Sequence, residues 1–350
     1  MTTAIKRNKE RDNKLRWRKI KPANHDEWLA EREHGIGASD AGAILGVSQY
    51  STPYRVWRRK VGIDEPIKEN WAMQQGHIFE QVIAEMFKEQ LGYDVIGLHA
   101  VENRAGKLDW LAVDREKPFL RVSPDWLFFS GEKRNEASKR ILECKTSRVN
   151  YTPDCLSNEC LSWWVQVQYQ MYVLGHDYAY LGFLCVETGD HWFEFIPYNK
   201  EYTEGTIIPA LEAFWRDNIL PAREVDDKEC KEQFAPALID SDDTLCKYPK
   251  EQAGKSIEID SDLAENILAY SNLSLQKKDT EKQINEVAER IKMQMGDAES
   301  IVGEDGKPCV TWKANKDSLK FDAKRFEKDY PDLFKEYCEV KPGVRVFKVK

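Results

Sequence analysis

The sequence lacks several features that mark common classes of protein. Its eight cysteines are scattered, with no CxxC pair and no histidine at zinc-ligand spacing, which argues against a zinc site and against a secreted disulfide framework. No apolar run approaches the length of a membrane-spanning helix, and the N-terminus lacks the apolar core of a signal peptide. We therefore expect a soluble protein in a reducing cytoplasm.

Positive charge is scarce over most of the chain. Residues 1–21 carry nine Lys or Arg and two acids, or +7, and the remaining residues carry −15, which gives the net charge of −8. Such an acidic body argues against bulk attraction to nucleic acid. A DNA contact would need local patches, such as residues 55–60 or 133–140, although solvated surfaces explain these charges equally well.

The 350 residues are 41% apolar and 11% aromatic, enough for a large core in one to three domains. Apolar spacing, proline starts and glycine stops predict helices over 25–35, 38–46, 52–62 and 76–92. Short strand-like runs fill 93–145 and return at 178–186 and 191–198, and helices are expected over 162–175 and about 201–219. The pattern predicts an α/β (α+β) fold, a central mixed sheet flanked by helices.

The C-terminal third has a different composition. Residues 221–258 are acidic and weakly patterned, and we expect a linker or long surface loop there. A long helix over about 261–295, a hairpin over 300–313 and a final strand over 343–350 follow. The predicted organisation is therefore a basic N-terminal arm (1–21), a main domain (22–220), the linker, and a small α+β module (259–350).

The stretch "RILECKTSRVN" places an acid and an ammonium on one face of a predicted strand. Glu143 and Lys145 point the same way because side chains alternate along a strand, and Asp125 precedes another apolar run in "VSPDWLFF". Two carboxylates, with the carbonyl oxygen of Cys144, could hold Mg²⁺. The lysine could then orient or deprotonate a bound water or offset charge on a phosphate. A structural ion pair on a solvated face is the alternative.

Glu80 lies on the flank of an apolar helical stripe formed by Ile78, Phe79, Val82, Ile83, Met86 and Phe87. Gly76 and Ala84, one turn to either side, leave room for a close neighbour. A carboxylate there could reach a buried site, or it could be an ordinary surface glutamate.

Five segments in the expected order resemble the motifs of the YqaJ viral recombinase family. They are "GIGASDAGAILGVSQYSTPYRVWRRKVG", "MQQGHIFEQVIAEMF", "SPDWLFF", "LECKT" and "WWVQVQYQMYVLG", within residues 25–220. That family groups with phage lambda exonuclease in the PD-(D/E)xK nuclease superfamily. The resemblance implies a restriction-endonuclease-like core and a Mg²⁺-dependent 5′-to-3′ exonuclease, with Mn²⁺ as an alternative ion, that leaves 3′ single strands on linear duplex DNA.

The resemblance also implies roles for particular residues. Asp125, Glu143 and Glu80 match metal-binding acids, Lys145 the catalytic lysine and Gln166 a helix glutamine at the site. Arg32 and Ser39, seven residues apart in "REHGIGAS", match a pair that binds the terminal phosphate. Asp109 or Asp114 could supply a further acid. Implied partners are DNA ends, a RecT- or Bet-like single-strand annealing protein and other copies in a ring-shaped trimer, in a bacterial or phage-infected cell.

Two readings of other classes remain open. A non-catalytic scaffold would bind DNA ends with the same fold, and an interaction protein would use Glu143 and Lys145 only as an ion pair. An endonuclease on the same fold is a further alternative. His34 and His77 are read as structural or surface residues, Trp163 and Trp164 as core, and Tyr50 and Arg55 as weak DNA-contact candidates.

Overall fold

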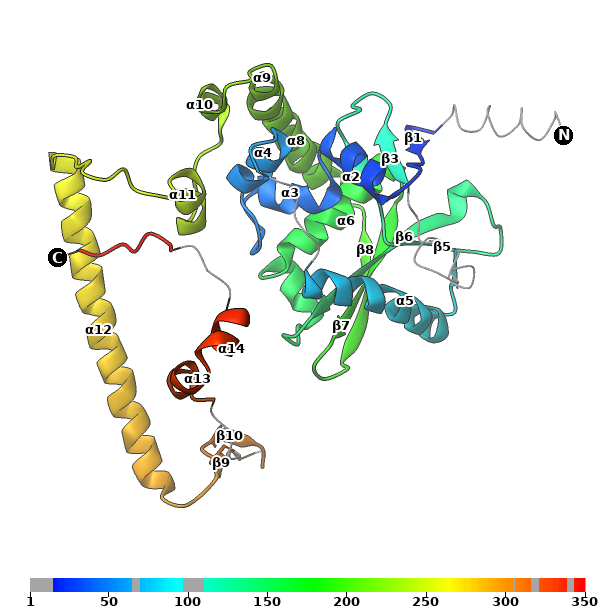
Figure 1. Cartoon of the computed structure of the whole chain (residues 1–350). Coiled ribbons are helices and arrows are strands. Elements are labelled where there is room, and N and C mark those ends of the chain that lie inside the picture. The colour runs from blue at the N-terminus through cyan, green and yellow to red at the C-terminus, as the bar shows by residue number, and fades with distance from the viewer. Residues whose placement is uncertain are drawn as a thin grey trace, which may run out of the picture. The chain divides into compact units, whose positions relative to one another are not determined.

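The computed structural model describes residues 15–64, 70–96, 110–304, 306–315, 321–338 and 343–349. The chain divides into two compact units, Met1–Thr244 and Leu245–Lys350. This division falls inside the segment 221–258 expected as a linker. Each unit is described by itself below (Figure 1).

A five-stranded mixed sheet forms the centre of the first unit. Its strands lie in the order β2 (Asp94–Val95), β5 (Trp126–Phe129), β6 (Lys139–Ser147), β7 (Tyr178–Cys185) and β8 (His191–Pro197). Strands β6 and β7 are parallel, and the other neighbours are antiparallel. A smaller antiparallel sheet joins β1 (Trp17–Ile20), β3 (Leu111–Asp114) and β4 (Arg121–Val122).

Helices flank the central sheet (Figure 1). Helix α5 (Trp71–Leu91) begins at Asn70, whose side chain accepts the Met73 N–H, and ends at Gly92 in the left-handed conformation. Its residues Ile83, Ala84 and Phe87 pack on the sheet in one core cluster with Leu142 and Cys144. Helix α6 (Leu161–Leu174) ends at Gly175, also left-handed, and covers the sheet face that carries Glu143. The predicted mixed sheet flanked by helices is confirmed.

The remaining described helices between residues 25 and 247 include several short ones and a helical path that leads toward the boundary, and the last of them, α11, spans the boundary between the two units. They are α2 (His25–Glu33), α3 (Ala38–Ile44), α4 (Pro53–Lys60), η2 (Glu136–Ser138), η3 (Pro153–Ser157), α7 (Lys200–Tyr202), η4 (Thr203–Ile207), α8 (Ile208–Phe214), η5 (Trp215–Ile219), α9 (Leu220–Arg223), α10 (Lys228–Lys231), η6 (Glu232–Phe234) and α11 (Ser241–Lys247). The single helix expected over 201–219 is a continuous helical path in which η4 and η5 are π-helical turns.

Two local expectations differ from the structure. The end of the predicted N-terminal arm forms β1, which pairs with β3 because its backbone completes the small sheet. On α5 the stripe residues Ile78 and Val82 are exposed, by 54% and 39%, whereas Glu80 is only 8% exposed. The sheet therefore covers the helix face centred on Glu80, Ile83 and Phe87, not the whole predicted stripe.

The second unit is built on the long helix α12 (Ser261–Met295), which begins at the capping residue Asp260 and ends at Gly296. Strands β9 (Ser300–Val302) and β10 (Pro308–Thr311) form the expected hairpin. Helices α13 (Ala323–Asp329) and α14 (Pro331–Glu336) were not predicted. The final strand predicted over 343–350 is wrong within 343–349, where the described backbone pairs with no strand.

In the part of the chain that the structure describes, no helix combines the length and the apolar character needed to cross a membrane.

Candidate active site

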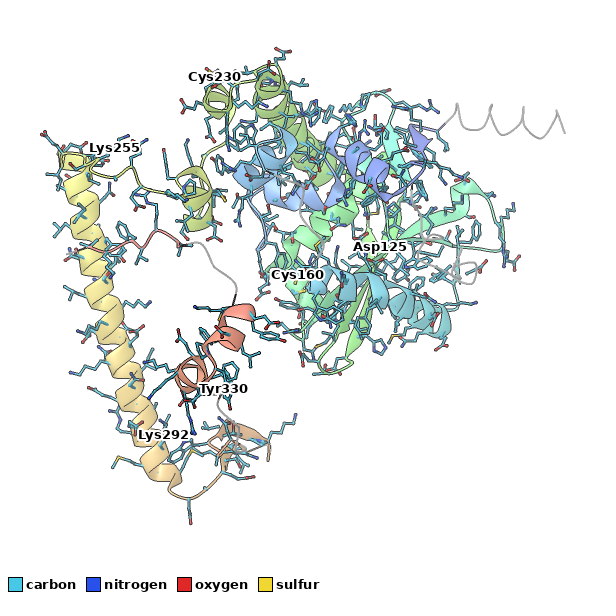
Figure 2. All side chains as sticks on the ribbon, in the orientation of Figure 1. Asp125, Cys160, Cys230, Lys255, Lys292 and Tyr330 are labelled. Atoms are coloured by element: carbon cyan, nitrogen blue, oxygen red, sulfur yellow. The ribbon has the colours of Figure 1, made fainter. Side chains whose placement is uncertain are left out.

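The candidate site lies where β5 begins beside β6. Pairing between these strands begins at Trp126 opposite Leu142, so β5 does not extend alongside the following residues of β6. Asp125, labelled in Figure 2, stands directly before β5, and its Oδ2 accepts the N–H of Cys144 at 2.9 Å. The conformation of the Pro124–Asp125 segment is thereby tied to the middle of β6, next to Glu143.

Glu143, Lys145 and Gln166 form one hydrogen-bonded group. Lys145 Nζ lies 2.9 Å from Glu143 Oε1 and 2.9 Å from Gln166 Oε1. The amide nitrogen of Gln166 donates to the same oxygen of Glu143. The structure therefore brings together the acid and lysine of the predicted strand face and the predicted glutamine of α6.

Gln170 is a partner of this group that the sequence analysis did not identify. Its Nε2 donates to Glu143 Oε2 at 2.8 Å, and its side chain is fully buried. Gln166 and Gln170 are four residues apart on α6, which places them on one helix face. This i,i+4 spacing in "QVQYQ" was the available signal. Gln168, between them, instead holds Pro197 O and the Asn199 N–H.

Two acids, Asp125 and Glu143, and one base, Lys145, lie close together in a largely buried part of the sheet, and their pKa values reflect this. Glu143 is 2% exposed; burial raises its pKa, and the negative charge of Asp125 raises it further. Burial by itself would lower the pKa of Lys145, but the charges of Glu143 and Asp125 raise it above the usual value. The two neighbouring carboxylates therefore favour the charged form of Lys145 in this arrangement.

The donors fit a hard cation by their chemistry. Asp125 and Glu143 supply carboxylates and Cys144 a carbonyl, the oxygen ligands that Mg²⁺ prefers, and the like-charge repulsion that raises the pKa of Glu143 is what a cation would relieve. Among the described residues, no three His, Cys, Asp or Glu side chains are arranged as a metal-binding cluster. The ligand set stays a prediction.

Glu80 approaches the same strands from α5. Its carbonyl oxygen accepts the indole N–H of Trp126 at 3.1 Å and lies 3.8 Å from the thiol of Cys144. Its carboxylate Oε1 lies 3.0 Å from His77 Nδ1. The structure thus places the backbone of Glu80 against Trp126 of β5 and Cys144 of β6.

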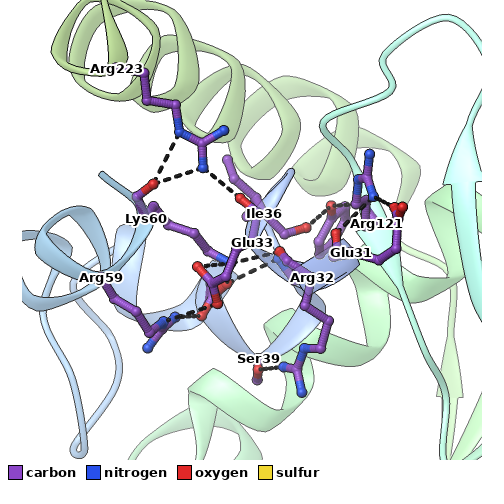
Figure 3. A network of polar contacts seen from close by, with 12 residues as sticks. Glu31, Arg32, Glu33, Ile36, Ser39, Arg59, Lys60, Arg121 and Arg223 are labelled. Atoms are coloured by element: carbon purple, nitrogen blue, oxygen red, sulfur yellow. Dashed lines mark hydrogen bonds and ion pairs between the residues drawn. The ribbon is translucent and has the colours of Figure 1, made fainter. Parts of the chain in front are cut away.

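Arg32 and Ser39 meet at the junction of α2 and α3 (Figure 3). Arg32 Nη2 lies 3.2 Å from Ser39 Oγ, and the guanidinium stacks over the ring of Trp28 at 4.6 Å. Burial lowers the pKa of Arg32, although its side chain is only half-buried and its hydrogen bond to Ser39 is solvent-exposed. An anion could therefore reach the guanidinium, and Ser39 is exposed and able to donate to the same anion.

A buried network supports this pair (Figure 3). Asp40 accepts the Gly37 N–H at 3.0 Å, lies 3.2 Å from Lys60 Nζ and forms an ion pair with Arg59. Burial would raise the pKa of Asp40, but the charges of Lys60, Arg59 and Arg32 hold it well below the usual range.

Three cations also cap the C-terminal end of α2. Arg121 donates to Glu31 O at 2.7 Å, Lys60 to Arg32 O at 2.9 Å and Arg223 to Glu33 O at 2.5 Å. These donors come from β4, α4 and α9, so three elements fix the backbone that carries Arg32 (Figure 3). Cations are favourable at this end of a helix because its last carbonyls lack partners within the helix.

Other candidates lie elsewhere or have structural partners. Asp114 is buried, pairs with Arg16 at 2.8 Å and accepts the N–H groups of Glu116 and Lys117, so its carboxylate organises a turn; Asp109 lies outside the described residues. Arg55 forms ion pairs with Asp240 and Asp243. Trp163 is buried against Phe183.

The chain is similar to known proteins over most of its length. The model of the YqaJ-like viral recombinase domain matches residues 27–177, which include every candidate residue above. The Uncharacterized protein YqaJ of Bacillus subtilis (strain 168) is 30% identical over 322 residues, covering 89% of this chain and 90% of that protein. The chain belongs to the YqaJ family. The predicted family is thereby confirmed over nearly the whole length.

Solved structures with similarity to this YqaJ-family chain are more distant. The alkaline exonuclease LHK-Exo from Laribacter hongkongensis aligns with a TM-score of 0.40 and 17% identity, over 59% of this chain and 97% of that one. A phage related exonuclease from Haemophilus somnus 129PT aligns with a TM-score of 0.37 and 12% identity, over 52% and 92%.

Proposed function

We propose that this protein is a metal-dependent exonuclease that degrades linear double-stranded DNA from 5′ ends and leaves 3′ single strands for annealing-type recombination. The observation that carries the proposal is the buried group of Glu143, Lys145 and Gln166, with Asp125 tied to the same strand. A buried Glu–Lys pair beside a second carboxylate is expensive unless a cation and a phosphate complete the charge balance. Membership of a viral recombinase family supports DNA as the substrate.

Asp125, Glu143 and the carbonyl of Cys144 would hold Mg²⁺, with Mn²⁺ as an alternative, and Glu80 would complete the acidic set from α5. When bound, such an ion polarises the phosphodiester and lowers the pKa of a coordinated water. Lys145, whose pKa the charges of Glu143 and Asp125 raise, would offset negative charge that develops on the scissile phosphate. Gln166 holds the Lys145 ammonium and the Glu143 carboxylate in one orientation.

Arg32 and Ser39 would hold the terminal 5′-phosphate. A guanidinium pairs well with an anion of two or more negative charges, and the Ser39 hydroxyl, 3.2 Å from it, adds a second donor. This end pocket, formed by Arg32 and Ser39, would favour DNA ends over internal bonds. By the same proposal, enclosure by a ring-shaped trimer would give processivity, and a RecT- or Bet-like annealing protein would receive the single strand.

A digestion with four arms tests the proposal. The substrates are a linear duplex with a 5′-phosphate at one end and a 5′-hydroxyl at the other, its strands labelled differently, and a covalently closed circle, each with Mg²⁺ or with chelator. We expect Mg²⁺-dependent loss of the strand that bears the 5′-phosphate. Cutting of the circle would indicate an endonuclease, and end-specific binding without digestion would indicate the scaffold; either result contradicts the proposal.

A further inference from the structure

The connection between α2 and α3, residues 34–37, joins the two side chains proposed to hold the terminal phosphate. Its central residue, Ile36, is fully buried and forms a parallel bridge with Leu120. The Ile36 N–H donates to Phe119 O at 2.7 Å, and Ile36 O accepts the Arg121 N–H at 3.2 Å. Both backbone polar groups of this buried residue therefore hold the connection between Arg32 and Ser39 against the segment 119–121.

Tyr169 reaches the same carbonyl from α6. Its hydroxyl donates to Ile36 O at 2.9 Å and accepts the Arg121 N–H at 2.9 Å. The side chain is fully buried, and burial raises the pKa of its phenol well above the usual value. The hydroxyl therefore remains a donor throughout the pH range of a nuclease assay.

The same helical turn holds the candidate catalytic acid. Gln166 and Gln170, which donate to the two oxygens of Glu143, flank Tyr169 on α6. Four residues of α-helix span about 6 Å along the axis and form a stiff unit because successive backbone hydrogen bonds overlap. One rigid turn thus links the carboxylate at the scissile bond with the backbone of the end pocket.

The other supports of the end pocket lack this link. Lys60 and Arg223 lie on α4 and α9 and hold the carbonyls of Arg32 and Glu33. Both fix the position of α2, but neither donates to a carboxylate of the Glu143 group in the hydrogen bonds that the structure describes. Tyr169 is therefore placed to set the distance between the two sites, and not merely the shape of one.

We infer that Tyr169 is a positioning residue that sets the separation between the terminal 5′-phosphate and the scissile phosphodiester, and thereby the length of the released product. The inference rests on the proposed exonuclease function. Loss of the hydroxyl would leave Arg32 and Ser39 able to bind the phosphate but would loosen their position relative to Glu143. Small misplacements of reacting groups reduce turnover strongly, with about 100-fold loss for an error near 1 Å.

The test compares Tyr169→Phe with Tyr172→Phe, its matched control on the same helix. The Tyr172 hydroxyl faces Lys117 Nζ at 3.4 Å, away from the end pocket. Each variant and the wild type digest duplexes with 5′-phosphate or 5′-hydroxyl ends in Mg²⁺, and chromatography resolves mononucleotides from dinucleotides. For Tyr169→Phe we expect about tenfold lower kcat on the phosphate substrate, KM within twofold, an unchanged rate on the hydroxyl substrate, and dinucleotide products. Tyr172→Phe keeps the wild-type rate ratio.

A Tyr169→Phe variant that slows both substrates equally, or keeps the wild-type ratio and product length, overturns the inference and leaves the proposed exonuclease standing. If the wild-type protein digests neither substrate, both the inference about Tyr169 and the proposed exonuclease function are overturned. Should Tyr169→Phe fail to fold, Ile36→Ala loosens the same connection from its other side. It is expected to reduce the 5′-phosphate preference in the same direction, and an unchanged preference in that variant overturns the inference.

Discussion

Three side chains donate hydrogen bonds to the buried carboxylate of Glu143. Lys145 and Gln166 share one of its oxygens, and Gln170 holds the other. Even so, burial and the neighbouring Asp125 raise its pKa, so the hydrogen bonds do not fully offset the loss of water and the like-charge repulsion. A site of this kind stores unfavourable energy that a bound cation would release, which gives a direct way to detect the ion.

Asp125→Asn tests whether the carboxylates bind a metal, independently of catalysis. In the wild type, Mg²⁺ at about 100 times its Kd should stabilise the folded protein by about 2.7 kcal/mol, because the ion binds the native state only. Asparagine keeps an acceptor for the Cys144 N–H but removes a charge. We expect the Mg²⁺-induced rise in Tm to disappear in the variant. An equal rise in both proteins would exclude Asp125 as a ligand.

Asp40→Asn tests the charge balance beneath the end pocket. The variant leaves Lys60 and Arg59 with their longer ion pairs to Glu33, at 3.5 Å and 3.8 Å, and loss of the buried carboxylate should cost about 3 kcal/mol at pH 7. Because the folded-state pKa of Asp40 lies below that of an unfolded aspartate, its stabilisation is full above about pH 4 and declines at lower pH. Urea unfolding at pH 7 and at pH 3 should show a larger difference from wild type at pH 7. A difference that is constant with pH would contradict this assignment.

At this scale, strand alternation was enough to place Glu143 and Lys145 on one face, and motif resemblance was enough to single out Gln166. The spacing of four residues from Gln166 was a signal for Gln170 that the sequence analysis did not use. Local spacing could not identify Lys60 or Tyr169 as supports of the site, because their contacts depend on how α4 and α6 are rotated about their axes when they pack.

The connection between α2 and α3 is the element on which the end pocket depends. It runs so close to the β3–β4 hairpin that a Cβ on Gly35 would lie 2.3 Å from Phe119 O and 2.9 Å from the Phe119 carbonyl carbon. Both are backbone atoms, so the chain itself would have to move. Glycine is required here because a Cβ would collide with the Phe119 backbone. The requirement does not come from a positive φ, which the backbone does not adopt at this residue.

Gly35→Ala should therefore destabilise the fold by about 1–3 kcal/mol, the usual cost of overpacking, and should reduce the preference for 5′-phosphate ends. Gly131→Ala is the control, because a Cβ there meets nothing within 4 Å. Denaturant unfolding and the ratio of digestion rates on the two ends measure the effects. Wild-type stability in Gly35→Ala would show that the connection can move freely.

Helices of the main domain were predicted well because capping residues, glycine stops and apolar spacing act locally. Helix α5 shows the limit of that reasoning. Its apolar residues cover more than one face, and Ile78 and Val82 are exposed while Glu80 is buried. The buried face is chosen by the sheet it meets. The end of the chain shows the same limit, since the alternating residues 343–349 make a strand only if another strand is available.

At the scale of the whole molecule, the two units differ in how their apolar residues are used. The first unit encloses the aromatic and aliphatic core around the sheet, whereas many apolar side chains of α12 are exposed, including Leu273, Ile284 and Val287. Helix α11 stabilises the first unit, because its buried Asp243 accepts a hydrogen bond from the Thr52 hydroxyl at 2.6 Å and pairs with Arg55.

A chain ended after Lys250 should consequently fold cooperatively, with the same urea midpoint for its transition as the first unit has in the full protein. A chain ended after Pro236 removes α11 and should lose stability, because Thr52 and Arg55 lose their partner. Circular dichroism of both chains checks this. Equal stability of the two chains would show that α11 does not support the main domain.

The central claim is that the Glu143–Lys145 group performs phosphodiester hydrolysis, and one comparison tests it most directly. Lys139 lies on β6 with the same side-chain parity as Lys145 but pairs with Glu136, away from Asp125. Nucleotide release from a linear 5′-phosphorylated duplex in Mg²⁺ is measured for wild type, Lys145→Ala and Lys139→Ala, with Tm recorded for each. The account predicts that Lys145→Ala loses at least about 1,000-fold in rate while folded, and that Lys139→Ala stays within about twofold. Digestion by folded Lys145→Ala at the wild-type rate would contradict it.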